Sequence, residues 1–154
     1  MSISSVLVRP IALGDHGQWR PLWDGYNAFY GREGQTALDE AVTRQTWERF
    51  FIATDPVKAF VAVMDEHVVG LVHTVYHPST TRLRDVCYLQ DLFTSASVRG
   101  HGVGRALIER VYDEARAMGC SRVYWTTFED NQTARHLYDR VTRYNGAIVY
   151  TKEL

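Results

Sequence analysis

The stretch SVRGHGVGRALIERV, residues 97–111, limits the possible folds most, because its glycines stand where an amphipathic helix begins. The glycines and arginines alternate as Arg99, Gly100, Gly102, Gly104 and Arg105. Glycine allows positive φ angles and close backbone approach, and a helix start presents unpaired N–H groups and the positive end of the helix dipole. The stretch therefore predicts an anion-binding loop before a helix, and the commonest such anion is a phosphate.

Hydrophobic periodicity predicts the elements around this loop. The predicted order is strand 6–11, helix 15–30, helix 39–51, a hairpin over 58–77 that turns at Asp65-Glu66, strand 86–94, helix 103–118 with Gly119 as its cap, strand 122–128, helix 131–141 and strand 146–154. This β-α-α-β-β-β-α-β-α-β order predicts a mixed α/β (α+β) fold with an antiparallel front half and a crossover helix in the back half. With 154 residues and no linker-like run, we expect a single domain over 1–154.

Composition removes several classes of function. A net charge of -1 argues against a nucleic-acid binder that relies on a basic surface. No apolar run approaches the roughly 20 residues of a membrane span, and the N-terminus has no basic region of the kind that opens a signal peptide. Cys87 and Cys120 lack CxxC spacing, so we expect neither a disulfide framework nor a zinc site. These features favour a cytoplasmic protein with no metal, no nucleic-acid partner and no membrane association.

Two phosphate-binding motifs fail on spacing. A Walker A loop needs a Gly-Lys pair, whereas Gly100 is followed five positions later by Arg105. A dinucleotide fingerprint needs GxGxxG near the start of a repeated βαβ unit, whereas here the glycines follow the pattern GxGxG and no second unit is evident.

Three segments together resemble the GNAT superfamily of acyl-CoA N-acetyltransferases. RGHGVG, residues 99–104, is similar to its R/Q-x-x-G-x-G/A signature, and YLQDLF, residues 88–93, is similar to its central strand. Asn131, Ala134, Leu137 and Tyr138 resemble its later N-x-x-A-x-x-L-Y helix. The resemblance is loosely nearest the small polyamine and histone acetyltransferase branch. It implies a GNAT fold, whose central and mostly antiparallel sheet has about six to seven strands flanked by helices.

The resemblance also implies acetyl-CoA as cosubstrate and assigns residues to it. The coenzyme A pyrophosphate is expected on the backbone N–H groups of Arg99, Gly100, His101, Gly102, Val103, Gly104 and Arg105. The pantetheine arm is expected on the backbone of Leu92, Phe93 and Thr94, where the central strand separates from its neighbour. Asn131 is expected to contact the coenzyme in addition to capping its helix.

Catalytic groups follow from what aminolysis of a thioester requires. Tyr138 is the expected general acid, since a phenol and the departing thiol are weak acids of comparable strength. Gln90 stands where polyamine-branch relatives often carry Glu, so a direct base is in doubt. Strand alternation points Asp91 to the face opposite that of Gln90. The remaining hypothesis is that the amine loses its proton through water, with Asp91 or Glu129 nearby.

The alternatives concern mechanism, acceptor and class. Neither cysteine has a visible partner base, so direct attack in a ternary complex is preferred to an acyl-enzyme. The acceptor amine can belong to a polyamine, an amino acid, an aminoglycoside or a protein lysine. A catalytically idle acyl-CoA-binding sensor and a nucleotide-phosphate binder are the rival classes. The apolar strand expected over 146–154 lies near a potential sheet edge and favours a homodimer.

Overall fold

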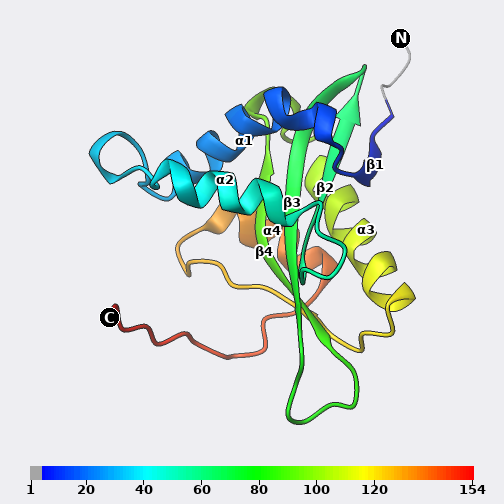
Figure 1. Cartoon of the computed structure of the whole chain (residues 1–154). Helices are drawn as coiled ribbons and strands as arrows, with labels where there is room; N and C mark the ends of the chain where they lie inside the picture. The colour runs from blue at the N-terminus through cyan, green and yellow to red at the C-terminus, as the bar shows by residue number, and fades with distance from the viewer. Residues whose placement is uncertain (1–4) are drawn as a thin grey trace.

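The protein is built around a single five-stranded sheet with the strand order β1-β2-β3-β4-β5 (Figure 1). This computed structural model describes residues 5–154. Residues 1–4, on which part of the expectation about a signal peptide falls, lie outside the described residues. The strands are β1 (Leu7–Pro10), β2 (Val57–Met64), β3 (His67–His77), β4 (Val86–Thr94) and β5 (Val123–Tyr124). Strands β1 to β4 pair antiparallel, and β5 pairs parallel to β4.

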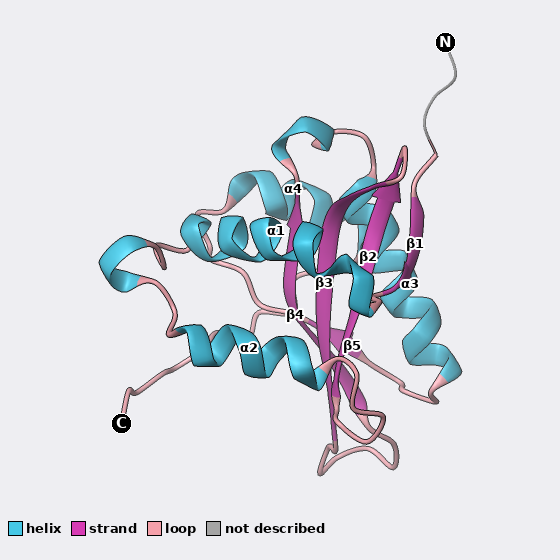
Figure 2. Cartoon of the chain, turned by 45° about the horizontal axis from the view of Figure 1, so that its top comes forward, coloured by secondary structure: helices cyan, strands magenta, loops and turns pink. Residues whose placement is uncertain are grey.

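Four helices cover the two faces of this sheet (Figure 2). They are α1 (His16–Phe29), α2 (Glu40–Arg49), α3 (Val103–Ala117) and α4 (Gln132–Val141). Helices α1 and α2 lie over one face, while α3 and α4 lie over the other. The order therefore confirms the predicted mixed α/β class as far as α4.

Each face has its own hydrophobic core. The core under α1 and α2 is rich in aromatic side chains, among them Trp19, Trp23, Tyr26 and Phe50. The core under α3 is mostly aliphatic, and its members include Val72, Leu89, Leu107, Ile108 and Val111. The two faces thus differ in chemistry, because aromatic rings dominate the α1 side and aliphatic side chains dominate the α3 side.

The turn between β2 and β3 has the geometry of a tight hairpin, as the sequence predicts. Asp65 and Glu66 both have positive φ, at 49° and 65°. A two-residue loop with positive φ at both positions matches the right-handed twist of the flanking strands. The turn therefore sets the pairing of Met64 with His67 and of Val63 with Val68, and an irregularity between Ala62 and Val63 shifts the register for the rest of β3, the strand that pairs with β4.

A β-bulge at Gln90 changes which face of β4 its later residues occupy. His73 pairs with Asp91 and Thr74 pairs with Leu89, so Gln90 has no partner in β3. Cys87 and Leu89 pack in the α3-side core, and simple alternation would place Asp91 there as well. The extra residue of a bulge reverses that alternation, and Asp91 instead lies on the α1 face.

The prediction of a last strand over 146–154, and with it a sheet of six to seven strands, is wrong for the chain as described. No residue after α4 belongs to a strand, and the segment extends away from the sheet (Figure 1). Predicted strand 122–128 also shortens to the two paired residues of β5. An apolar strand pattern needs a neighbouring edge for its N–H and C=O groups, and this segment does not return to one.

Candidate active site

The loop between β4 and α3 holds two glycines in a conformation that other residues rarely adopt. Gly100 and Gly102 have φ angles of +83° and +80°, and Gly102 is the N-cap of α3. A Cβ built on either glycine would meet nothing within 4 Å. The backbone angle, rather than crowding, therefore requires glycine at these positions, and the space beside the loop stays open.

The N–H groups of this loop divide into used and unused donors. The His101 N–H donates to the Val98 carbonyl at 3.2 Å, so it is engaged within the loop. The first helical bond of α3 runs from the Ala106 N–H to the Gly102 carbonyl at 3.0 Å. The N–H groups of Val103, Gly104 and Arg105 precede that bond and lie at the positive end of the helix. These three donors form an anion-binding arrangement.

The two arginines that flank the glycines have different environments. The Arg99 guanidinium lies 5.8 Å from the centre of the Phe93 ring, against the end of β4. The Arg105 Nε donates to Glu109 one helical turn later at 2.9 Å, and both side chains are half exposed. Both cations thus remain close to the open side of the loop.

The second half of β4 has an open edge. Strand β5 pairs with β4 only at Cys87 and Tyr88. Within the described part of the chain, no strand lies beside β4 on that side from residue 89 onward. Leu92, Phe93 and Thr94 occupy this stretch and are only partly buried. Their main chain is therefore free on one side to accept an extended amide-containing ligand.

Tyr138 lies on α4, whose start is fixed by Asn131. The Asn131 Oδ1 accepts the Ala134 N–H at 3.4 Å, and its Nδ2 donates to Thr127 Oγ1 at 3.3 Å. The Tyr138 ring meets the Trp125 ring edge to face, with 5.4 Å between centres. Burial, with a smaller contribution from Tyr30, raises the pKa of Tyr138 to about 12. The side chain is therefore a neutral phenol at physiological pH.

A close contact between α3 and α4 brings Tyr138 near the glycine loop. A Cβ on Gly104 would lie 3.2 Å from Leu137 Cδ2, so the lack of a side chain lets the two helices approach here. Gly104 belongs to the first turn of α3, and Leu137 directly precedes Tyr138. The packing thus brings the phenol-bearing turn of α4 to the helix end that carries the free N–H groups.

Asp91 lies on the other side of β4, in contact with a histidine that is not among the predicted site residues. Asp91 Oδ2 is 2.9 Å from His73 Nδ1, and His73 Nε2 accepts the Trp19 N–H at 3.1 Å. Both members of the pair are buried. The expectation that strand alternation turns Asp91 away fails because of the bulge at Gln90. Glu129, in contrast, is exposed on the loop before α4.

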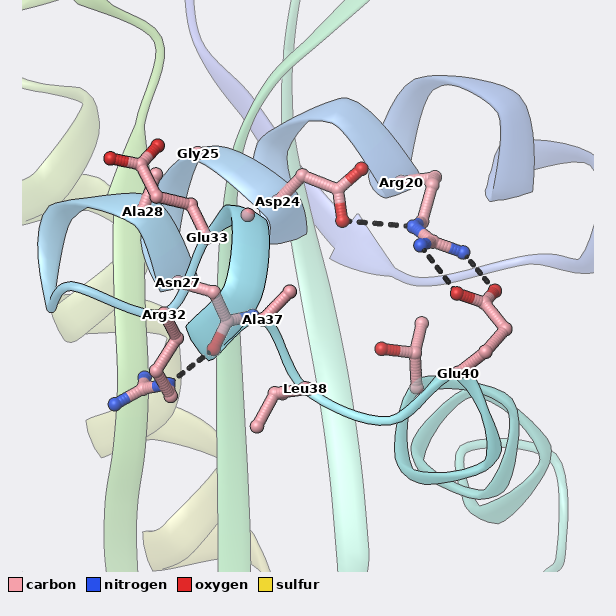
Figure 3. Close-up of a pocket in the computed structure, with 12 residues that line it drawn as sticks. Arg20, Asp24, Gly25, Asn27, Ala28, Arg32, Glu33, Ala37, Leu38 and Glu40 are labelled. Carbon is pink, nitrogen blue, oxygen red and sulfur yellow. Dashed lines mark hydrogen bonds and ion pairs between the residues drawn. The ribbon is translucent and has the colours of Figure 1, made fainter.

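A hollow of about 510 Å³ lies between α1, the segment 32–38 and the start of α2 (Figure 3). Its wall carries charged side chains that already have partners. The Arg20 guanidinium bonds both Asp24 and Glu40, and the Arg32 Nε donates to Asn27 Oδ1 at 2.7 Å. No residue predicted from the sequence to act in catalysis or coenzyme binding lines it. The paired charges make this hollow a structural feature of the α1–α2 connection.

Across residues 5–154, no three His, Cys, Asp or Glu side chains gather closely enough to hold a metal ion. None of the helices described is both long and apolar enough to cross a membrane.

Comparison with known proteins identifies the family of the chain. The acetyltransferase (GNAT) family matches residues 19–142. A D-amino-acid N-acetyltransferase of Saccharomyces cerevisiae is 30% identical over 149 residues, 96% of this chain and 90% of that protein. A thialysine N-epsilon-acetyltransferase of Caenorhabditis elegans is 28% identical over 94 residues, 61% of this chain and 58% of that protein.

Solved structures agree on the fold. The aminoglycoside N-acetyltransferase AAC(6')-Iy, in complex with a bisubstrate analogue, matches with a TM-score of 0.80 at 17% identity, over 98% of this chain and 99% of that one. A structure described as a transcriptional regulator from Bacillus halodurans matches with a TM-score of 0.82 at 20% identity, over 97% and 100%. From the family match and the yeast relative, the chain belongs to the acetyltransferase (GNAT) family.

Proposed function

We propose that this acetyltransferase moves the acetyl group of acetyl-CoA to a primary amine by direct attack in a ternary complex. The observation that carries this proposal is a neutral phenol, Tyr138, on a helix whose preceding residue, Leu137, packs against Gly104 in the first turn of α3. The two cysteine thiols also favour direct attack over a covalent acyl-enzyme. Burial raises the pKa of Cys87 to about 12 and also raises that of Cys120, so neither is an activated thiolate.

Coenzyme A fits the loop and the open strand edge. We assign its pyrophosphate to the residues of 99–105, with the N–H groups of Val103, Gly104 and Arg105 as direct donors and the guanidinium of Arg99 close by. His101 contributes its place in the loop rather than its N–H group, which Val98 already accepts. The pantetheine amides are assigned to the main chain of Leu92, Phe93 and Thr94. Asn131, the N-cap of α4, is assigned a contact with the same ligand.

The reaction needs one bond made and one broken. The neutral amine nitrogen attacks the thioester carbonyl, and the carbon–sulfur bond then breaks as the tetrahedral intermediate collapses. Tyr138 donates its proton to the departing sulfur, which leaves as the free thiol of coenzyme A. The nitrogen loses its extra proton through water, and that proton restores the phenol or enters the solvent. The products are an N-acetyl amide and coenzyme A.

Free amino acids and related small amines lead the acceptor candidates. The yeast relative is named for D-amino acids and the nematode relative for thialysine. Release of free thiol from acetyl-CoA, measured with D- and L-amino acids, thialysine, spermidine, an aminoglycoside and a histone peptide, tests the assignment. Turnover with one class identifies the acceptor. Thermal stabilisation by coenzyme A without turnover on any amine would instead support the idle acyl-CoA-binding sensor.

The pH dependence of kcat is a first prediction. An alkyl ammonium with a pKa near ~10 must lose its proton before attack, so activity rises with pH. Tyr138 works in its protonated form, and its pKa of about 12 keeps it protonated throughout the usual assay range. We therefore expect no alkaline fall in kcat up to about pH 10. A descending limb centred between pH 8 and about pH 10 would show that a different acid acts.

A homodimer accounts for the exposed C-terminal segment. Ile148, Val149 and Tyr150 are 68%, 65% and 88% exposed, although their pattern is that of a strand. We propose that the segment 146–154 of one copy pairs with the open sheet edge of a second copy. Light scattering should give twice the mass of one chain. Val149→Asp should shift the protein to a monomer, whereas Leu83→Asp, at an exposed apolar residue elsewhere, should not. A monomeric wild-type protein would contradict the proposal.

We also propose a reducing, cytoplasmic setting. It is supported by two cysteines that are both free, one of them buried in the core. Extracellular proteins of this size usually pair such cysteines in disulfides.

A further inference from the structure

A buried chain of three polar side chains crosses the aromatic core beneath α1. Trp19 from α1 donates its Nε1–H to His73 Nε2 on β3, and His73 Nδ1 lies 2.9 Å from Asp91 Oδ2 on β4. Trp19 is 0% exposed and His73 2% exposed. The His73 ring is also enclosed by the rings of Trp23 and Phe50, at 5.2 and 4.7 Å between centres.

The hydrogen-bond directions determine the protonation state of His73. An indole nitrogen can only donate, so His73 Nε2 must be the unprotonated nitrogen. A carboxylate can only accept, so the proton must be on Nδ1 and point to Asp91. A second proton on Nε2 would face the Trp19 N–H inside a closed aromatic cage. Trp19 thus holds His73 in a single neutral tautomer.

In this tautomer His73 gives Asp91 a hydrogen bond without a positive charge. His73 is the only basic side chain within ion-pair distance of Asp91 in residues 5–154, and a neutral histidine, like the Tyr26 hydroxyl that also bonds Asp91, offers a hydrogen bond but no positive charge. A buried carboxylate without a cation is costly, and such a group attracts one from outside the chain. The cation that this reaction brings to the site is the protonated form of the acceptor amine.

Asp91 and Tyr138 come from opposite faces of the sheet, and Tyr30 is near both of them. Burial and the charge of Asp91 raise the pKa of both Tyr26 and Tyr30 on α1. After burial, Tyr30 is the smaller cause of the raised pKa of Tyr138. Tyr30 therefore lies close to both the carboxylate and the phenol, and its ring centre is 5.0 Å from that of Tyr26 and 5.8 Å from that of Phe128, on the loop before α4.

From this geometry we propose that Trp19 and His73 are positioning residues that hold Asp91 as an oriented anion for the acceptor ammonium. The inference rests on the proposed function, because it assigns the recognition of the acceptor within that same site. In this arrangement Asp91 binds the amine before it loses its proton. The role of Trp19 is to prevent His73 from becoming a cation that would take the place of the substrate.

The other titratable and charged groups around His73 and Asp91 do not set the charge next to Asp91 in the way that His73 does. Tyr26 and Tyr30 from α1 are uncharged at neutral pH because their pKa values are raised. Arg32 stacks over both tyrosine rings, and its charge is constant over the assay range. His16 lies beyond Trp19, with its ring centre 6.0 Å from the indole. His73 is therefore the ring whose hydrogen bonds to Trp19 and Asp91 the variants below are chosen to change.

The first test compares two tryptophan variants that differ in their hydrogen-bond partner. Trp19→Phe removes the donor to His73, while Trp23→Phe removes the same N–H from the same helix, where it serves Thr43. Both rings contact His73. With Trp19→Phe we expect KM for a cationic acceptor to rise about tenfold between pH 8 and about pH 6, with kcat nearly unchanged. Trp23→Phe should keep the wild-type KM at both pH values. Equal behaviour of the two variants would overturn the proposal.

The second test uses nitrogen NMR of the His73 side chain, identified by its loss in His73→Asn, and requires no turnover. The wild-type ring should show protonated Nδ1 and unprotonated Nε2 without change between about pH 5 and pH 8, and Trp19→Phe should make it titrate. A wild-type ring that is protonated on Nε2, or that titrates in this range, would overturn the tautomer assignment. If the His73 ring stayed in one tautomer in a protein that shows no turnover, the proposed function would be refuted, whereas the tautomer assignment would remain.

A third comparison covers the case in which Trp19→Phe fails to fold. His73→Asn keeps an N–H for Asp91 and cannot titrate, so KM should stay close to the wild-type value at each pH. His73→Leu removes that donor and should raise KM roughly tenfold at every pH. If both substitutions raised KM alike, the hydrogen bond to Asp91 would have no positioning role.

Discussion

Replacing Tyr138 with phenylalanine is expected to lower kcat by about 10²- to 10⁴-fold, the range that general acid catalysis usually contributes. The ring packing against Trp125 remains, and no hydrogen bond of the coenzyme loop is removed, so the affinity for coenzyme A should stay close to that of the wild type. Steady-state rates with the best acceptor, together with calorimetric titration of coenzyme A, separate the two effects.

Tyr112→Phe is the matched control. Tyr112 on α3 is also partly buried, and its hydroxyl donates to the Val141 carbonyl at 3.2 Å. The same atom is removed from the same residue type, but away from the glycine loop, so only a small loss of stability is expected. Normal kcat in Tyr138→Phe, or an equal fall in both variants, would contradict the role given to Tyr138.

Gly102→Ala is expected to raise KM for acetyl-CoA by roughly tenfold or more with a smaller change in kcat. Gly102 adopts φ +80° at the N-cap of α3, and a residue with a Cβ pays about 1–2 kcal/mol there. The loop can avoid that strain only by changing φ, which redirects the N–H groups of Val103 and Gly104. Initial rates at varied acetyl-CoA measure the effect.

Gly119→Ala is the control that separates the backbone strain caused by Gly102→Ala from its effect on acetyl-CoA binding. Gly119 has φ +82° just beyond the opposite end of the same helix, so its backbone strain is of the same kind. Its substitution also displaces the flexible Arg84 side chain, which lies 3.2 Å from the added Cβ. The melting temperature should fall in both variants, but KM for acetyl-CoA should rise only in Gly102→Ala. A rise of similar size in Gly119→Ala would refute the loop assignment.

Local sequence signals were sufficient for most of the fold. Strand β4 coincides with the predicted 86–94, and the positive φ of Asp65 and Glu66 follows from the tight turn predicted between two apolar runs. Helices α1 to α4 agree with their predicted positions within a few residues, because periodicity and capping residues are local. The family match has the same origin, since its motifs are short and contiguous.

The features that were missed depend on contacts between distant residues. The bulge at Gln90 leaves no mark in the alternation of VCYLQDLFT, yet it decides the face of Asp91. Trp19 and His73 are 54 residues apart and meet only after α1 packs on the sheet. A histidine inside the apolar run VVGLVHTVY was the one available signal, because a buried imidazole needs partners. The segment 146–154 has a strand pattern but no edge within its own chain to pair with.

Initial rates of thiol release, measured while acetyl-CoA and the acceptor amine are both varied, test the central claim most directly. Direct attack in a ternary complex predicts double-reciprocal lines that intersect, and no acetyl group on the protein after incubation with acetyl-CoA alone. Parallel lines, together with an acetylated protein, would show a covalent intermediate. That result would contradict an account in which the amine meets the thioester on the enzyme and Tyr138 protonates the departing sulfur.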